Sequence, residues 1–185
     1  MINSWHSNFL DTLFPYLTYL GGGFLSGLAV LFFLFISYRW AIICSASFIV
    51  TGLITQLLKR TVFADCTRPM KFFADNQVIH TVPGVDMHMY NSFPSGHTTA
   101  AFSLFFMLAL TLKGPQRSWG VLFLLLAVLG GYSRIYLGQH FPEDVLAGSL
   151  IGVLVTYLCY SFLIRLLRGR EWAQRGLFKK AISHE

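Results

Sequence analysis

The residues best suited to chemistry stand in one short stretch, Ser92 to Thr99, which reads SFPSGHTT. Its composition is that of a helix start: Ser95 is a good N-cap residue, and Gly96 lets a ligand approach the backbone closely. The first amides of a helix have no internal partners and carry the positive end of its dipole, which favours a bound phosphate. His97 would place an imidazole beside such an anion. The plainer alternative is a helix cap with an incidental histidine.

A second helix start reads His140-Phe-Pro-Glu-Asp144. Proline suits the first turn of a helix, and the spacing of four residues lets Asp144 lie near His140 if the turn is helical. A carboxylate bonded to one imidazole nitrogen fixes the tautomer, leaves the other nitrogen as nucleophile or base, and is expected to raise the pKa of the ring. A simple capping interaction is the alternative. We expect Glu143 to be a solvated carboxylate.

The composition excludes most soluble folds. Of 185 residues, 55% are hydrophobic and only 12% are charged, whereas soluble domains carry about a quarter charged residues. The formal charge of +6 does not indicate nucleic acid, because the basic residues gather where apolar runs end, as in membrane proteins. The cysteines, Cys44, Cys66 and Cys159, form neither a disulfide framework nor a metal cluster pattern.

We therefore predict an all-α integral membrane protein, a bundle of about five to six transmembrane helices with an amphipathic N-terminal helix, in one domain over residues 1–185. The interfacial helix covers about residues 1–17, ends near Pro15 and turns Trp5, Phe9, Leu10, Leu13 and Phe14 to one apolar face. The predicted spans are residues 18–37, 41–58, 98–112, 118–132 and 145–164, followed by a basic tail at 165–185.

Glycine residues indicate where the predicted helices pack closely, and basic residues indicate how the bundle is oriented in the membrane. Gly21-Gly22-Gly23 would allow close helix contact, and Tyr38-Arg39-Trp40 is predicted to form a tight turn. Arg39, the turn at 113–117 and the tail put nine of the 14 lysines and arginines on one side, which the positive-inside rule makes cytoplasmic. The polar loops at 60–95 and 135–143 then face outward. That rule does not explain Arg68 and Arg134, which lie on the outer side.

Four segments on this outer side carry an ordered pattern. Arg68-Pro69, then Pro94-Ser95-Gly96-His97, then Ser133-Arg134-x5-His140-x3-Asp144 resembles the three-part signature of the type 2 phosphatidic acid phosphatase superfamily. The gap of 35 residues between His97 and Ser133 is also similar to that of the family. One position departs from the pattern. The family usually has lysine, then six intervening residues, then Arg-Pro. In this chain the lysine position is Thr61, so Lys59 or Arg60 would have to fill that role.

The resemblance implies a role for each matching residue. It implies that His140 attacks phosphorus and becomes a phosphohistidine, held by Asp144, while His97 protonates the leaving oxygen. The phosphate oxygens would be bound by Arg68, Arg134 and Lys59, with the Ser95 hydroxyl and the Gly96 amide. Clustered cationic donors suit a highly charged phosphoryl transition state, so no metal and no cofactor is expected. We expect His80 and His88 to be plain surface residues and not zinc ligands.

Two classes of function follow. The first is an integral membrane phosphatase of a bacterial inner membrane, with its site facing the periplasm or exterior and its C-terminus in the cytoplasm. Its substrate would be a lipid phosphate or diphosphate, such as undecaprenyl diphosphate, phosphatidylglycerophosphate, phosphatidic acid or lipid A phosphate, and its partner the bilayer; no obligate protein partner is evident. The second is a transporter or channel for phosphate-bearing solutes, but such proteins place charges at mid-membrane, and here they lie at the ends of spans.

Overall fold

The computed structural model describes residues 5–74 and 79–178, and every regular element in those ranges is helical. The prediction of an all-α chain is confirmed for this part. The elements are α1 (Asn8–Leu17), η2 (Thr18–Gly21), α2 (Gly23–Ile36), α3 (Tyr38–Thr61), α4 (Pro69–Phe72), α5 (Gly96–Thr111), η3 (Gly114–Ser118), α6 (Trp119–Tyr136), α7 (Pro142–Leu166) and α8 (Glu171–Gln174).

The helices that could cross a membrane are fewer than predicted. By length and composition these are α3, η3 with α6, and α7, and the bent pair formed by α1–η2 and α2 would make a fourth. Helix α5 is apolar but has only 16 residues, a length of about 24 Å against a hydrocarbon core of roughly 30 Å. The predicted count of five to six spans is therefore not confirmed.

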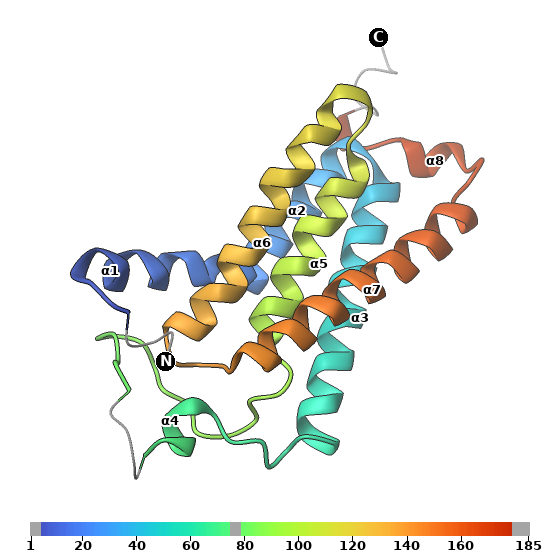
Figure 1. Ribbon diagram of the computed structural model, residues 1–185. Helices are drawn as coiled ribbons and strands as arrows, with labels where there is room; N and C mark the ends of the chain where they lie inside the picture. The colour runs from blue at the N-terminus through green and yellow to red at the C-terminus, as the bar shows by residue number, and fades with distance from the viewer. Residues whose placement is uncertain (1–4, 75–78, 179–185) are drawn as a thin grey trace.

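Helix α5 lies at the centre of the bundle (Figure 1) and packs against α2, α3, α6, α7 and η2. Its closest neighbour is α7, because two glycines of α7 leave no room for a side chain. A Cβ atom on Gly148 would lie 2.6 Å from the carbonyl oxygen of Ser95, and one on Gly152 would lie 2.6 Å from that of Thr99. One turn further along α7, the Thr156 hydroxyl lies 2.7 Å from that of Ser103. This seam fixes the start of α5 against the start of α7.

The first predicted span, 18–37, is not one helix. Its glycine run breaks it at Gly22, whose backbone is extended, and the segments on either side of the break are bent by 48°. The break lets η2 pack against the start of α5, since a Cβ atom on Gly21 would lie only 2.3 Å from the carbonyl oxygen of His97. The close contact expected of these glycines is present, but between η2 and α5.

Helix α1 lies crosswise to the other helices (Figure 1). It continues past Pro15 to Leu17, because the Thr18 N–H still donates to the carbonyl of Phe14. The predicted apolar face is divided. Phe14 is buried in a ring stack on Tyr136, with centroids 4.1 Å apart, whereas Trp5 and Phe9 are largely exposed.

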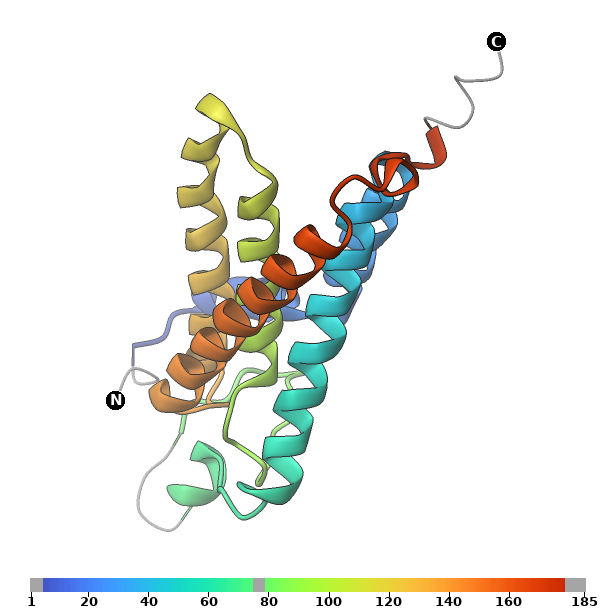
Figure 2. The same cartoon turned by 90° about the vertical axis from the view of Figure 1, so that its right-hand side faces the viewer.

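The basic segments share one end of the bundle. The turn between α2 and α3 and the turn at η3 lie at the end of the bundle where α8 lies, opposite α4 and the long loop (Figure 1). The predicted tight turn at 38–40 is wrong, since α3 begins at Tyr38 with Ser37 as its cap. Figure 2 shows α7 running obliquely across the bundle toward this end. The first part of the tail contacts the start of α3, where the Ser37 hydroxyl donates to the Ala173 carbonyl. The last residues of the predicted tail, 179–185, lie outside the described ranges.

Candidate active site

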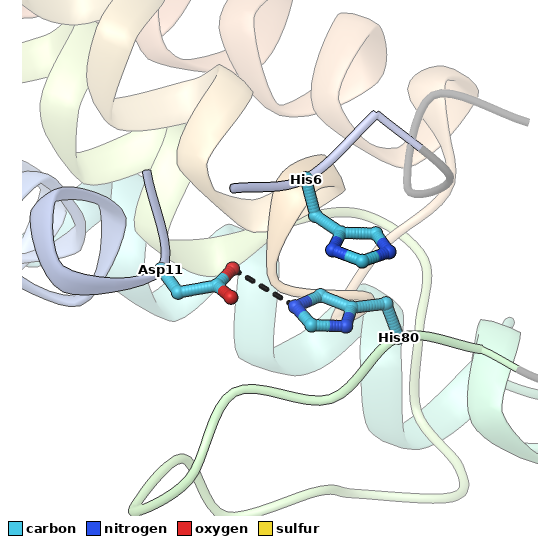
Figure 3. A group of neighbouring side chains, drawn as sticks. All are labelled: His6, Asp11 and His80. Carbon is cyan, nitrogen blue, oxygen red and sulfur yellow. Dashed lines mark hydrogen bonds and ion pairs between the residues drawn. The ribbon is translucent and has the colours of Figure 1, made fainter. Parts of the chain in front are cut away.

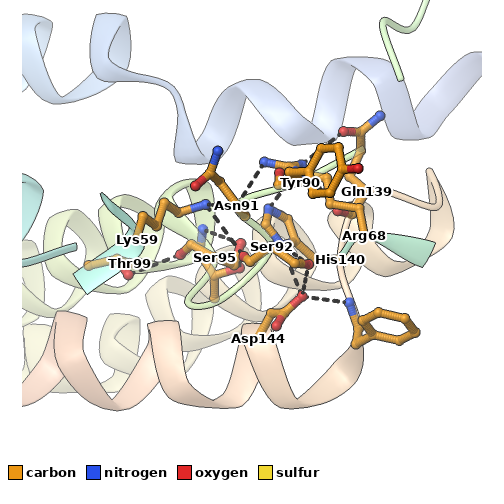
Figure 4. Close-up of polar contacts among 12 residues, drawn as sticks. Lys59, Arg68, Tyr90, Asn91, Ser92, Ser95, Thr99, Gln139, His140 and Asp144 are labelled. Atoms are coloured by element: carbon orange, nitrogen blue, oxygen red, sulfur yellow. Dashed lines mark hydrogen bonds and ion pairs between the residues drawn. The ribbon is translucent and has the colours of Figure 1, made fainter. Parts of the chain in front are cut away.

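The candidate residues meet at the other end of the bundle, where α3 and α6 end and where α4, α5 and α7 begin (Figures 1 and 4). Six of the eight predicted side chains are buried there: Lys59, Arg68, Ser95, Arg134, His140 and Asp144. Burial of this many polar groups is costly unless they are paired or face a ligand. Of the two candidates for the first-motif lysine, Lys59 is buried at this end of the bundle and Arg60 is exposed, which favours Lys59.

His140 and Asp144 form a buried pair. The Nδ1 atom of His140 lies 3.2 Å from Oδ2 of Asp144, and the ring is only 3% exposed. The contact does not arise within a helix, because His140 precedes the cap residue of α7. Asp144 occupies the third position of α7, and its Oδ2 also accepts the Phe141 N–H at 2.9 Å. The carboxylate thus caps the helix and holds the imidazole with the same oxygen.

The surroundings of His140 assign its tautomer. Its Nε2 atom lies 3.5 Å from a guanidinium nitrogen of Arg68, which has only donors, while Nδ1 faces the acceptor oxygen of Asp144. Both contacts fit a proton on Nδ1 and a lone pair on Nε2. Burial lowers the pKa of His140 far below its usual value, and Arg68, Lys59 and Arg134 add to this, outweighing the opposing effect of Asp144. The predicted rise is therefore wrong, and the neutral ring is favoured.

Arg68 and Lys59 are held by the loop that precedes α5. The Nε atom of Arg68 donates to the Tyr90 carbonyl at 2.9 Å, and one terminal nitrogen donates to the backbone and side-chain oxygens of Gln139 at 3.1 and 3.2 Å. Lys59 donates to the Asn91 carbonyl at 2.8 Å. Both side chains therefore rest on backbone oxygens, within electrostatic range of the Asp144 carboxylate.

Arg134 is held by an element that comes from the other end of the sequence. One terminal nitrogen donates to the hydroxyl of Thr18 in η2 at 2.7 Å. Within residues 5–74 and 79–178, the buried Nε atom of Arg134 has no hydrogen-bond partner. A donor buried without a partner is unfavourable unless a ligand satisfies it. An anionic oxygen would do so.

The start of α5 carries the remaining three residues. The Ser95 hydroxyl caps the helix by accepting from the Thr98 N–H at 3.4 Å and the Thr98 hydroxyl at 2.9 Å, which leaves its own proton free to be donated. A Cβ atom on Gly96 would meet nothing closer than 3.8 Å, so packing does not require glycine there. The His97 side chain is exposed, lies within electrostatic range of Arg134, Lys59 and Arg68, and forms no side-chain hydrogen bond within the described ranges.

Sequence reasoning missed three residues that position this site. The Ser92 hydroxyl donates to Asp144, Gln139 holds Arg68, and Thr18 holds Arg134. No periodic pattern marks the first two, because both lie in irregular segments. Ser92 nevertheless belongs to the stretch that leads into the second motif, and its position two residues before Pro94 is the available signal.

Comparison with known proteins agrees with this geometry. The sequence profile of the PAP2 superfamily matches residues 40–168, which include every candidate site residue. The chain belongs to the PAP2 superfamily. The resemblance found in the ordered motifs is thus confirmed.

Curated relatives of this PAP2 superfamily member align with it over part of their length and part of this chain. It is 44% identical over 82 residues to the bacitracin transport permease protein BcrC of Bacillus licheniformis, and 33% identical over 86 residues to the undecaprenyl-diphosphatase BcrC of Bacillus subtilis. These alignments cover 42% and 46% of this chain and 38% and 42% of the relatives, so the chain spans about two fifths of their length. LpxE from Aquifex aeolicus has a similar structure, with a TM-score of 0.74, 27% identity, and coverage of 86% of this chain and 90% of LpxE.

Proposed function

We propose that this PAP2 superfamily member is an integral membrane phosphatase that hydrolyses a lipid phosphate or diphosphate through a phosphohistidine intermediate, without a catalytic metal. The observation that carries the proposal is the buried His140–Asp144 pair, which faces three cations and the amide end of α5. Three cations against one carboxylate leave a net positive mouth suited to a phosphate dianion. Guanidinium groups and amides stabilise the charge that develops during phosphoryl transfer.

The reaction would proceed in two steps. In the first, the lone pair on Nε2 of His140 attacks phosphorus, the N–P bond forms, and the P–O bond to the leaving group breaks as His97 donates a proton to that oxygen. In the second, water attacks phosphorus, the N–P bond breaks and inorganic phosphate leaves, with His97 accepting a proton from the water. Arg68, Arg134 and Lys59 would hold the phosphate oxygens, and Asp144 would hold the imidazole in its reactive tautomer.

The decisive experiment is phosphate release by the purified protein in detergent from a panel of lipid phosphates. The panel contains undecaprenyl diphosphate, phosphatidylglycerophosphate, phosphatidic acid and a lipid A phosphate, and the preferred member names the substrate. Since side chains supply the positive charge, activity is expected to survive EDTA, and vanadate is expected to inhibit. Release from none of these lipids would overturn the proposal, and loss on chelation that magnesium restores would overturn the metal-free chemistry.

A pocket beside His97 supports a lipid substrate. It has a volume of about 230 Å³ and lies between η2, α2, α3 and α5, with small residues such as Gly23, Gly52 and Thr55 in its lining. The pocket therefore joins the proposed leaving-group side of the site to the outer surface of the helices. A lipid chain in this pocket would leave the phosphate at the mouth while its tail stayed in the bilayer.

Filling this pocket should separate lipid from soluble substrates. A Cβ atom on Gly52 meets nothing within 4 Å, so Gly52→Phe can place its ring in the pocket without displacing the backbone. We expect kcat/KM for the preferred lipid to fall by about tenfold or more, and that for a small aryl phosphate to change little. Gly27→Phe is the control, because Gly27 is exposed, equally open and outside the pocket. Equal losses in both variants would argue against this path.

The phosphate-release assay also tests the alternative that the protein is a transporter. The Bacillus licheniformis relative is named a transport permease, whereas in this chain Lys59, Arg134 and Asp144 lie within three residues of the ends of their helices. Charges at helix ends favour a site at the mouth of the bundle over one at mid-membrane. A protein that moved phosphate-bearing solutes into vesicles without releasing phosphate would be a transporter.

The orientation is tested by its cysteines. If the basic end of the bundle is cytoplasmic, the half-buried Cys66 lies outside and should react in intact cells with an impermeant thiol reagent. Cys44 is buried in the bundle and Cys159 is partly covered, so the bilayer should protect both. Cys66→Ser is the control that assigns the signal. Labelling of Cys66 only after lysis would place the site on the cytoplasmic side.

A further inference from the structure

A second group of polar side chains gathers at the end of the bundle that carries the candidate active site, where α1 and the long loop meet. His6 precedes α1, Asp11 lies in its first turn, and His80 comes from the loop 69 residues further along (Figure 3). Nε2 of His80 lies 2.9 Å from Oδ1 of Asp11, and the rings of His6 and His80 stack with centroids 3.8 Å apart. None of the three has a role in the proposed phosphatase chemistry.

These side chains form a donor set for a divalent metal. Each offers one ligand atom, and the three atoms all lie within 4.8 Å of one another. Two imidazoles and a carboxylate are ligands that zinc accepts at about 2.0–2.2 Å, with water in the fourth position. The Tyr136 hydroxyl donates to Oδ1 of Asp11 at 2.6 Å, which is the kind of second contact that orients a ligating carboxylate.

The rings would need to turn before they bind one ion. Their planes are inclined by only 4°, so the two nitrogens do not face a common point in the stacked arrangement. Donors around a tetrahedral zinc ion stand roughly 3.4 Å apart, so the three atoms must also move closer together. His6 is exposed and begins outside α1, and rotation of its side chain needs no change in the helix packing.

We propose that His6, Asp11 and His80 bind a zinc ion that ties the segment before α1 to the long loop. The consequence concerns the loop itself. Its later residues supply the carbonyl oxygens that hold Arg68 and Lys59, and the Ser92 hydroxyl that holds Asp144. A metal at His80 would therefore stabilise the support of the active site without taking part in the chemistry. Sequence reasoning expected no metal, since it considered His80 only together with His88.

The test is zinc binding by the full chain in detergent, stripped with EDTA and freed of any histidine tag. When zinc is added to the stripped protein, we expect one bound zinc ion per chain by elemental analysis and a rise in the midpoint of thermal unfolding. Asp11→Asn replaces the anionic ligand with a weak neutral one, and His80→Ala removes an imidazole. Each should weaken zinc binding at least tenfold and abolish the thermal shift. His88→Ala is the matched control, because His88 lies on the same loop, is exposed and is outside the group.

The outcomes separate this proposal from the phosphatase. Absence of bound zinc at micromolar concentrations, or binding that persists unchanged in both Asp11→Asn and His80→Ala, would overturn the site. Circular dichroism shows whether the variants fold. Phosphate release by His80→Ala should be indifferent to zinc, and a zinc requirement that survives in this variant would indicate a catalytic metal elsewhere and contradict the metal-free mechanism instead.

Discussion

Replacing His140 with alanine is expected to remove the phosphoenzyme entirely and to lower lipid phosphate hydrolysis by at least about 10³-fold, as is typical when a covalent nucleophile is lost. The reason is the geometry around Nε2. Asp144 and the Ser92 hydroxyl occupy the Nδ1 side of the ring, and burial keeps the ring neutral, so its free lone pair points to the cations. Rapid quench with a radiolabelled substrate measures the trapped intermediate.

A comparison with His97→Ala makes this prediction sharp. On an activated ester such as a nitrophenyl phosphate the leaving group departs without an acid, so His97→Ala should still form the phosphoenzyme while failing on lipid substrates. Asp144→Asn should retain a slower intermediate, because the amide keeps the cap but stabilises the reactive tautomer less well. If His97→Ala lost the phosphoenzyme on the activated ester and His140→Ala kept it, the two roles would have to be exchanged.

A single methyl group on Gly148 should destabilise the protein and impair its site together. The new Cβ atom would lie 2.6 Å from the Ser95 carbonyl oxygen and 3.2 Å from Cβ of Thr98, so α5 and α7 must separate. Overpacking of this kind costs roughly 1–3 kcal/mol. The same movement would disturb the hydrogen bond from the Ser95 amide to the Asp144 carbonyl, 2.9 Å long, which links the two helix starts. Thermal unfolding in detergent and phosphate release measure the two effects.

Gly27→Ala is the matched control for Gly148→Ala. Both glycines lie within helices, but Gly27 is exposed and a Cβ atom there meets nothing within 4 Å. Because alanine is about 1 kcal/mol more favourable than glycine in a helix interior, Gly27→Ala should be neutral or stabilising. Unchanged stability and activity in Gly148→Ala would show that the seam between α5 and α7 does not fix the site.

How much of the site could be predicted depends on how far apart in the sequence the contacting residues lie. The helix start at Ser95 and the closeness of His140 to Asp144 follow from spacings of a few residues, and both are present. The pairing of Arg134 with Thr18 joins residues 116 apart and could not be read from any local pattern. The sign of the pKa shift of His140 could not be predicted for the same reason. Burial in the packed bundle is the main cause that lowers this pKa, and three cations from distant segments add to it, against the opposing effect of the carboxylate four residues away.

The predictable and unpredictable parts of the fold differ in the same way. Apolar runs predicted the cores of α3, α6 and α7. The helices extend beyond the predicted spans by up to four residues, except at the start of α6, because helical backbone continues into polar residues such as Lys59 and Arg134. Hydropathy could not distinguish a straight span from the broken one at 18–37. The break at Gly22 lets Gly21 lie against the backbone of His97, and that contact is a property of the packed bundle which hydropathy does not contain.

The break at Gly22 also bears on how substrate preference could diversify. The superfamily profile matches residues 40–168, yet η2, which lies before them, contacts the Arg134 side chain through Thr18 and the His97 backbone through Gly21. The segment η2 therefore borders the pocket beside His97, although it lies outside the residues that the superfamily profile matches. Substitutions in η2 can therefore reshape the space beside His97 while every motif residue stays in place.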